Sequence, residues 1–112
     1  MRFLFLIHGD TEGEAALSPE ERRAIVSEHT AYASMLRGRG VYVLGEALTG
    51  EATTVLPGEE PFVTDGPFAE TKEGIGGFYV VECASRDEAL QLAGKVPASP
   101  GVAVEVRAIA DL

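Results

Sequence analysis

The sequence predicts an α+β fold in which two helices pack against one four-stranded β-sheet. Two observations predict it. A serine followed three residues later by a glutamate precedes each of two helical segments, at Ser18 and at Ser85, and this pattern is typical of a helix start. Apolar and β-branched segments precede and follow each helix, so the order strand, helix, strand occurs twice along the chain.

The first strand is predicted over residues 3–7, whose sequence FLFLI is apolar at every position, as in a central strand covered on both faces. The first helix begins after Ser18, with Pro19 at the first helical position. One face of this helix collects Ile25, His29, Tyr32 and Leu36, and a pair of glycines ends it. Residues 41–48 are rich in β-branched and aromatic residues and predict the second strand.

An insertion of residues 49–74 follows the second strand. Within it, residues 53–56 and 62–64 predict a β-hairpin, and the Pro-Gly pair between them suits the centre of a type II turn. Long ordered connections tend to carry function. We therefore expect the insertion to pack near the first helix, with Phe62 and Phe68 as apolar anchors.

The second strand–helix–strand unit begins at residues 75–83, which contain the strong strand signal FYVV. The second helix follows Ser85 and ends before Pro97. Alternating valines over residues 102–107 predict the last strand. This order, with the insertion as a β-hairpin between strands two and three, is the split βαβ pattern of ferredoxin-like domains.

The first strand also predicts a homodimer. Phe3, Phe5 and Ile7 point to one side of the sheet, and Leu4 and Leu6 point to the other. Two helices cover only one face of a four-stranded sheet, so the second apolar face requires a partner. We expect two copies of the chain to pack their sheets face to face.

Length and charge narrow the classes of partner. A chain of 112 residues fits a single domain over residues 1–112, and its formal net charge of −9 argues against nucleic-acid binding.

The apolar N-terminal run is too short for a signal peptide or a membrane span. The single cysteine, Cys83, cannot form an internal disulfide, which favours a reducing, cytoplasmic location.

Residues 64–73 read TDGPFAETKE, and this segment resembles the signature of the DGPF proteins, a branch of the YCII-related family. The stretches EHTAYASMLRGRG, GEAL and VEVR elsewhere in the chain also resemble this family. The resemblance implies ferredoxin-like protomers joined in a dimeric α/β barrel. It also implies a suspected enzyme activity through a helix-one histidine paired with an acid, and His29 matches that histidine. Family members occur beside sigma factors, which implies a link to transcription regulation.

Two residues are candidates for catalysis. His29 shares a helical face with apolar residues, so its imidazole should point toward the sheet and could act as a general base near neutral pH. The alternative is a core histidine bonded to backbone. Asp65 opens a turn in the insertion and could be the acidic partner of His29; the alternative is that its carboxylate only bonds nearby backbone amides.

Four further residues are candidates for ligand binding: His8, Tyr32, Glu70 and Lys72. His8 ends the first strand, where it could face the mouth of a pocket. Tyr32, like Tyr79, could present its hydroxyl to a ligand, or could be a core aromatic with a polar tip. Glu70 and Lys72 lie in the insertion and could equally form a solvated charged surface. No spacing indicates a metal site, and no cofactor is indicated.

Three readings of the function remain open. The first is a small-molecule enzyme whose cleft lies between the first helix, the sheet and the DGPF segment. The second is a binding or sensing module linked to transcription regulation. The third is a structural dimerisation domain. A cleft lined by His29 and Asp65 would favour the first two, and a filled core there would favour the third.

Overall fold

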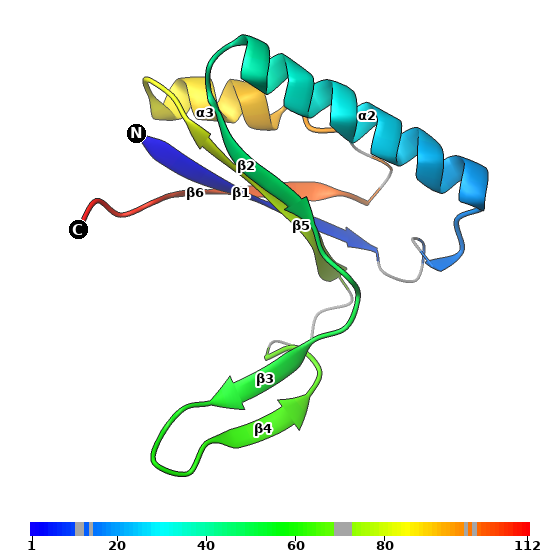
Figure 1. The fold of residues 1–112 in the computed structure, drawn as a ribbon, viewed down its shortest axis with the longest axis vertical. Helices are drawn as coiled ribbons and strands as arrows, with labels where there is room; N and C mark the ends of the chain where they lie inside the picture. The colour runs from blue at the N-terminus through cyan, green and yellow to red at the C-terminus, as the bar shows by residue number, and fades with distance from the viewer. Residues whose placement is uncertain (11–12, 14, 69–72, 98, 100) are drawn as a thin grey trace.

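The computed structural model describes residues 1–10, 13, 15–68, 73–97, 99 and 101–112. Its elements are β1 (Arg2–Asp10), α2 (Pro19–Gly38), β2 (Tyr42–Ala47), β3 (Thr53–Leu56), β4 (Phe62–Asp65), β5 (Glu73–Glu82), α3 (Arg86–Ala93) and β6 (Ala103–Ala108) (Figure 1). The order of these elements confirms the predicted one, including the hairpin β3–β4 between β2 and β5.

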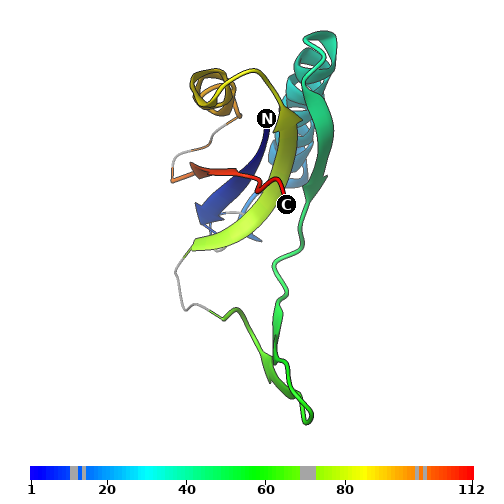
Figure 2. The same ribbon diagram turned by 90° about the vertical axis from the view of Figure 1, so that its left-hand side faces the viewer.

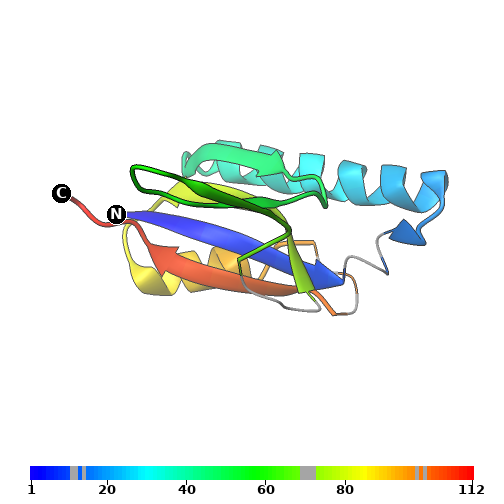
Figure 3. The same cartoon turned by 90° about the horizontal axis from the view of Figure 1, so that it is seen from below.

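The main sheet has the strand order β2-β5-β1-β6, and every neighbouring pair is antiparallel. The central strands β1 and β5 each precede one helix, β1 before α2 and β5 before α3, as the split βαβ pattern requires, so the fold is of the predicted ferredoxin-like α+β class. Both helices lie on the same side of the sheet: seen from below in Figure 3, the sheet lies in front of α2 and α3. One face of the sheet is thus covered, and the other is open.

Serine caps begin both helices. In α2 the backbone N–H of Glu21 donates to the Ser18 hydroxyl at 3.1 Å, and the Glu21 carboxylate accepts the backbone N–H of Ser18 at 3.2 Å, which completes the predicted capping box. In α3 the Ser85 hydroxyl likewise accepts the Glu88 N–H. The Glu88 carboxylate accepts the N–H of Ala84 instead of that of Ser85, so the second box is not reciprocal.

The core lies between the covered face and the two helices. Phe3 and Phe5 of β1 and Val81 of β5 are almost fully buried, against Leu36 of α2 and Leu92 of α3. Alternation along β1 places Phe3 and Phe5 on the same face, and the strand register puts Phe3 opposite Val81. These large side chains, drawn from four elements, hold the helices on the sheet by apolar burial.

The hairpin β3–β4 projects away from the sheet and from α2 (Figures 1 and 2). The expectation that the insertion packs near the first helix is therefore wrong. Both expected anchors are exposed, Phe62 by 60% and Phe68 by 83%. The Leu48 N–H donates to the Gly76 carbonyl at 2.9 Å, which extends the pairing of β2 with β5 one residue beyond Ala47. The chain therefore leaves the sheet along the direction of β2 on its way to the hairpin.

The turn of the hairpin also differs from the prediction. A type II turn centred on the Pro-Gly pair needs a positive φ at Gly58, and Gly58 has none. A longer connection over residues 57–61 joins β3 to β4. The positive φ of this region occurs at Gly66, at 100°, where the Gly66 N–H donates to the Ala52 carbonyl and closes the base of the hairpin.

Across the described ranges, no helix has both the length and the apolar character needed to cross a membrane.

Candidate functional site

An open cleft of about 880 Å³ lies between α2 and the β2–β5 side of the sheet. Helix α2 contributes Ile25, Val26 and His29 to its wall, and the strands contribute Gly45 and Tyr79. The cleft therefore lies at the covered face of the sheet. It is near the end of β2 and the start of β5, between which the hairpin is inserted. Its volume lies in the usual range of small-molecule sites.

A histidine and a tyrosine are joined in the wall of this cleft. The Nδ1 atom of His29 lies 2.7 Å from the hydroxyl oxygen of Tyr79, and this hydrogen bond connects α2 to β5. Their rings are nearly parallel, with an interplanar angle of 14° and centroids 5.9 Å apart. His29 is only half-buried, so it is held by a specific partner while it also lines the cleft.

Burial sets the protonation states of this pair. It lowers the pKa of His29, and the nearby Glu28 carboxylate opposes that shift only in part. Burial, together with Tyr42, raises the pKa of Tyr79. At neutral pH the pair therefore consists of a neutral imidazole and a protonated phenol. A neutral imidazole can accept a proton, as a general base must.

Gly45 of β2 makes room for the tyrosine ring. It pairs with Tyr79 across the β2–β5 ladder, and a Cβ atom at position 45 would come within 2.6 Å of Cε1 of that ring. A side chain at this position would displace the ring that holds His29. Gly45 was not predicted as a site residue, and the GEAL stretch that contains it was the available signal; Tyr79 was predicted as a possible ligand contact or a core aromatic, and not as the partner of His29.

Three charged residues also line the cleft: Arg22, Arg37 and Glu46. The guanidinium carbon of Arg37 lies 4.3 Å from the centroid of the Tyr42 ring, a cation–π contact that holds this arginine along the cleft. The remaining lining residues are mostly apolar or small, such as Ile7 and Leu48. The site thus suits a compact organic molecule with an apolar body and at least one polar group.

Tyr32 lies behind the cleft instead of in its wall. It is 5% exposed, and its hydroxyl donates to the Leu92 carbonyl at 2.7 Å, so the hydroxyl is used to tie α2 to α3. Burial strongly raises its pKa. Its ring meets the Tyr79 ring edge to face, with centroids 5.1 Å apart, and thereby supports the partner of His29 from behind.

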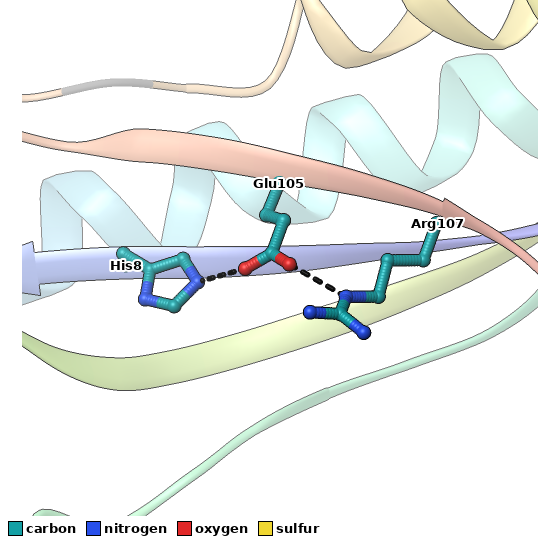
Figure 4. Close-up of polar contacts among 3 residues, drawn as sticks. All are labelled: His8, Glu105 and Arg107. Atoms are coloured by element: carbon teal, nitrogen blue, oxygen red, sulfur yellow. Dashed lines mark hydrogen bonds and ion pairs between the residues drawn. The ribbon is translucent and has the colours of Figure 1, made fainter. Parts of the chain in front are cut away.

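His8 lies on the opposite, open face of the sheet (Figure 4). Its Nε2 atom is 2.9 Å from a carboxylate oxygen of Glu105, and the other oxygen of that carboxylate accepts the Nε–H of Arg107. The Arg107 bond first, and the His8 bond second, lower the pKa of Glu105. The structure therefore does not bring His8 and His29 together.

Asp65 is placed at the end of β4, where it pairs with Thr53 and is exposed. It is not among the residues that line the cleft. Glu70 and Lys72 lie outside the described residues. The partner of His29 seen within one protomer is thus a phenol and not the expected carboxylate.

The described ranges contain no group of three or more His, Cys, Asp or Glu side chains that could hold a metal ion. The buried thiol of Cys83 donates to the Ser85 carbonyl at 3.4 Å, and burial raises its pKa, which keeps it in the unreactive thiol form.

Comparison with known proteins adds two findings. The family model described as the YCII-related domain matches residues 1–112. A curated protein of Rhizobium meliloti (strain 1021), described as uncharacterized, is 37% identical over 98 residues, which cover 83% of this chain and 77% of that relative.

Proposed function

Since the chain belongs to the YCII-related family, whose matched relative is described only as uncharacterized, we propose a function from the cleft itself. We infer that the protein is a small-molecule enzyme in which His29 transfers protons and Tyr79 orients its imidazole. The observation that carries this proposal is the 2.7 Å bond between His29 Nδ1 and the Tyr79 hydroxyl in the wall of the cleft.

The two ring nitrogens of His29 have different roles in the proposed proton transfer. In one tautomer the Nδ1–H of His29 donates to the Tyr79 oxygen, which leaves the lone pair on Nε2 to accept a proton from a substrate. The imidazolium that forms keeps its bond to Tyr79, and returns the proton from Nε2 to the product. Because the pKa of His29 is lowered, the imidazole is already in the basic form at neutral pH.

We propose that the active protein is a homodimer joined through the open face of the sheet. That face carries Leu4, Leu6, Leu44, Phe78 and Val80. The protomer exposes 8073 Å², whereas a compact monomer of 11.8 kDa exposes about 5,900 Å². The excess of roughly 2,200 Å² per copy is of the size that an obligate homodimer buries.

One observation favours a second candidate, a binding or sensing module without catalysis. Among the described hydrogen bonds, the partner of His29 is a phenol, and no carboxylate is bonded to its imidazole. A site of this kind could hold a ligand and report its presence without transforming it. Binding that is never followed by turnover would select this candidate.

The test is a screen of small organic molecules by thermal shift, followed by turnover assays on those that bind. His29→Gln and Tyr79→Phe should both abolish turnover of any substrate found, because the first removes the base and the second removes the atom that orients it. Arg23→Gln is the control, since Arg23 is exposed on α2, does not line the cleft and lies away from the open face, and it should leave turnover unchanged. Turnover by His29→Gln at the parent's rate would contradict the proposal.

A further inference from the structure

The hairpin β3–β4 is apolar on both of its faces. Val55 lies opposite Val63 on one face, and Leu56 lies opposite Phe62 on the other, and all four side chains are about half exposed or more. A surface hairpin commonly keeps one face polar, because one face meets water. Apolar pairs on both faces indicate that this hairpin is covered on both faces in the working protein.

The apolar pairs are concentrated at the far end of the hairpin. Its base, next to the body of the same chain, carries Thr53, Thr54, Thr64 and Asp65. Apolar residues concentrated at the far end of the hairpin suit contact with another molecule, because the far end lies away from the sheet and helices of the same chain (Figure 2).

The overall dimensions point the same way. The radius of gyration is 15.7 Å, whereas a compact domain of this length has about 13 Å. A two-stranded hairpin is marginally stable by itself in water. Among the residues that the structure describes, β3 pairs with β4 and with no other strand. By itself the extended hairpin therefore has little stability, and contact with a neighbouring molecule would add to it.

We propose that the hairpin β3–β4 is a dimerisation arm that packs against a second copy of this chain. The inference rests on the homodimer proposed above and adds a second contact surface to it. We choose a second copy as the molecule that covers the arm because each protomer carries both the exposed arm and an open apolar sheet face. A two-fold symmetric dimer can therefore cover both surfaces of both copies and leave neither surface exposed. The excess exposed area of each protomer is large enough for the sheet face and the arm together.

The experiment compares the full-length chain with the double variant Val55→Thr, Val63→Thr. Threonine keeps the β-branched shape that suits a strand and replaces one apolar methyl group with a hydroxyl. Sedimentation velocity over a concentration series should show a dimer dissociation constant at least tenfold higher in the variant. Val26→Thr is the matched control, because Val26 is 65% exposed on α2, away from both the arm and the open face, and it should leave the dissociation constant unchanged.

A second measurement covers the case in which the double variant fails to fold. Amide hydrogen exchange of the parent should be slow over residues 53–56 and 62–65 at concentrations where the dimer dominates, and fast after dilution to the monomer. Exchange that does not depend on concentration would overturn the arm. A parent that dimerises with the same affinity as the double variant would also overturn the arm and leave the sheet-face dimer standing, whereas a parent that is monomeric at every concentration would overturn both.

Discussion

The two faces of the main sheet have similar sequences and different surroundings. Phe3 and Phe5 on one face of β1 are 1% and 0% exposed, whereas Leu4 and Leu6 on the other face of the same strand are only half-buried. All four are large and apolar, so hydrophobicity does not distinguish the faces. The difference arises because α2 and α3 both lie on one side, so the position of the helices, and not the hydrophobicity of the strand, decides which face of the protomer is buried (Figure 3).

Each face also carries one of the two histidines. On the covered face, His29 is bonded to Tyr79 and burial lowers its pKa. On the open face, His8 is bonded to Glu105, which Arg107 also holds. His29 belongs to α2, and the packing of α2 on the sheet both half-buries its imidazole and forms the cleft, whereas His8 lies on the face that neither helix covers.

The largest expected contrast between the faces is in stability. Phe5→Ala should lower the free energy of unfolding by about 3–5 kcal/mol, because it leaves a cavity among fully buried side chains. Leu6→Ala should cost clearly less at low protein concentration, since its side chain already meets solvent. Urea unfolding of both variants measures the difference, and equal losses would remove the distinction between the faces.

Gly45→Ala should have the next largest effect. The new methyl group would collide with the Tyr79 ring, and overpacking of this kind costs about 1–3 kcal/mol. Displacement of the ring should also break the bond to His29, which NMR titration of the His29 imidazole detects. Gly58→Ala, where a Cβ meets nothing within 4 Å, is the control. An unchanged His29 titration in Gly45→Ala would contradict the role of the glycine.

Tyr79→Phe should cost about 1 kcal/mol of stability, because it leaves the half-buried Nδ1 of His29 without its partner. Tyr42→Phe is the matched control, since the phenylalanine ring still lies under Arg37, and it should cost little. Chemical unfolding at pH 7.5 compares them. If both substitutions cost the same, the hydroxyl of Tyr79 has no special role in holding His29.

A smaller effect is expected from pH. The pKa of His29 in the folded protein lies below its unfolded value of about 6.5, so the unfolded chain binds more protons between the two values. The contribution of His29 is therefore fully present above about pH 6.5 and is lost as the pH falls through the lower folded pKa. Between pH 7.5 and 5.5 the parent should lose more thermal stability than His29→Gln. Parallel pH profiles would contradict this expectation.

The smallest effect is expected on the open face. His8→Gln should change the melting temperature by less than about 2 °C at protein concentrations where the monomer dominates, because solvent screens the His8–Glu105 pair. A larger change that appears only at high concentration would indicate that this pair lies in the dimer interface. A large change in the monomer would contradict the contrast between the two histidines.

The site could be predicted only in part. The spacing of apolar residues along α2 correctly indicated that His29 faces the sheet, since a helix repeats every 3.6 residues. Its partner could not be found in this way, because Tyr79 is 50 residues further along the chain, and the contact depends on how α2 sits over β5. The same limit explains why Asp65 was predicted as the partner of His29 although it does not line the cleft. Its position in the insertion did not indicate in which direction the hairpin would point.

By itself the sequence determined the local structure: the start of α2 at its serine cap, the order of strands and helices, and the hairpin inside the insertion. These features depend on contacts between residues close in the chain, or on a periodicity that a short segment displays. Only the tertiary structure decided which face of β1 is covered, that Tyr79 holds His29, and that the hairpin points away from α2. Each of these depends on the packing of distant segments, and the free energy of that packing is not contained in any one of them.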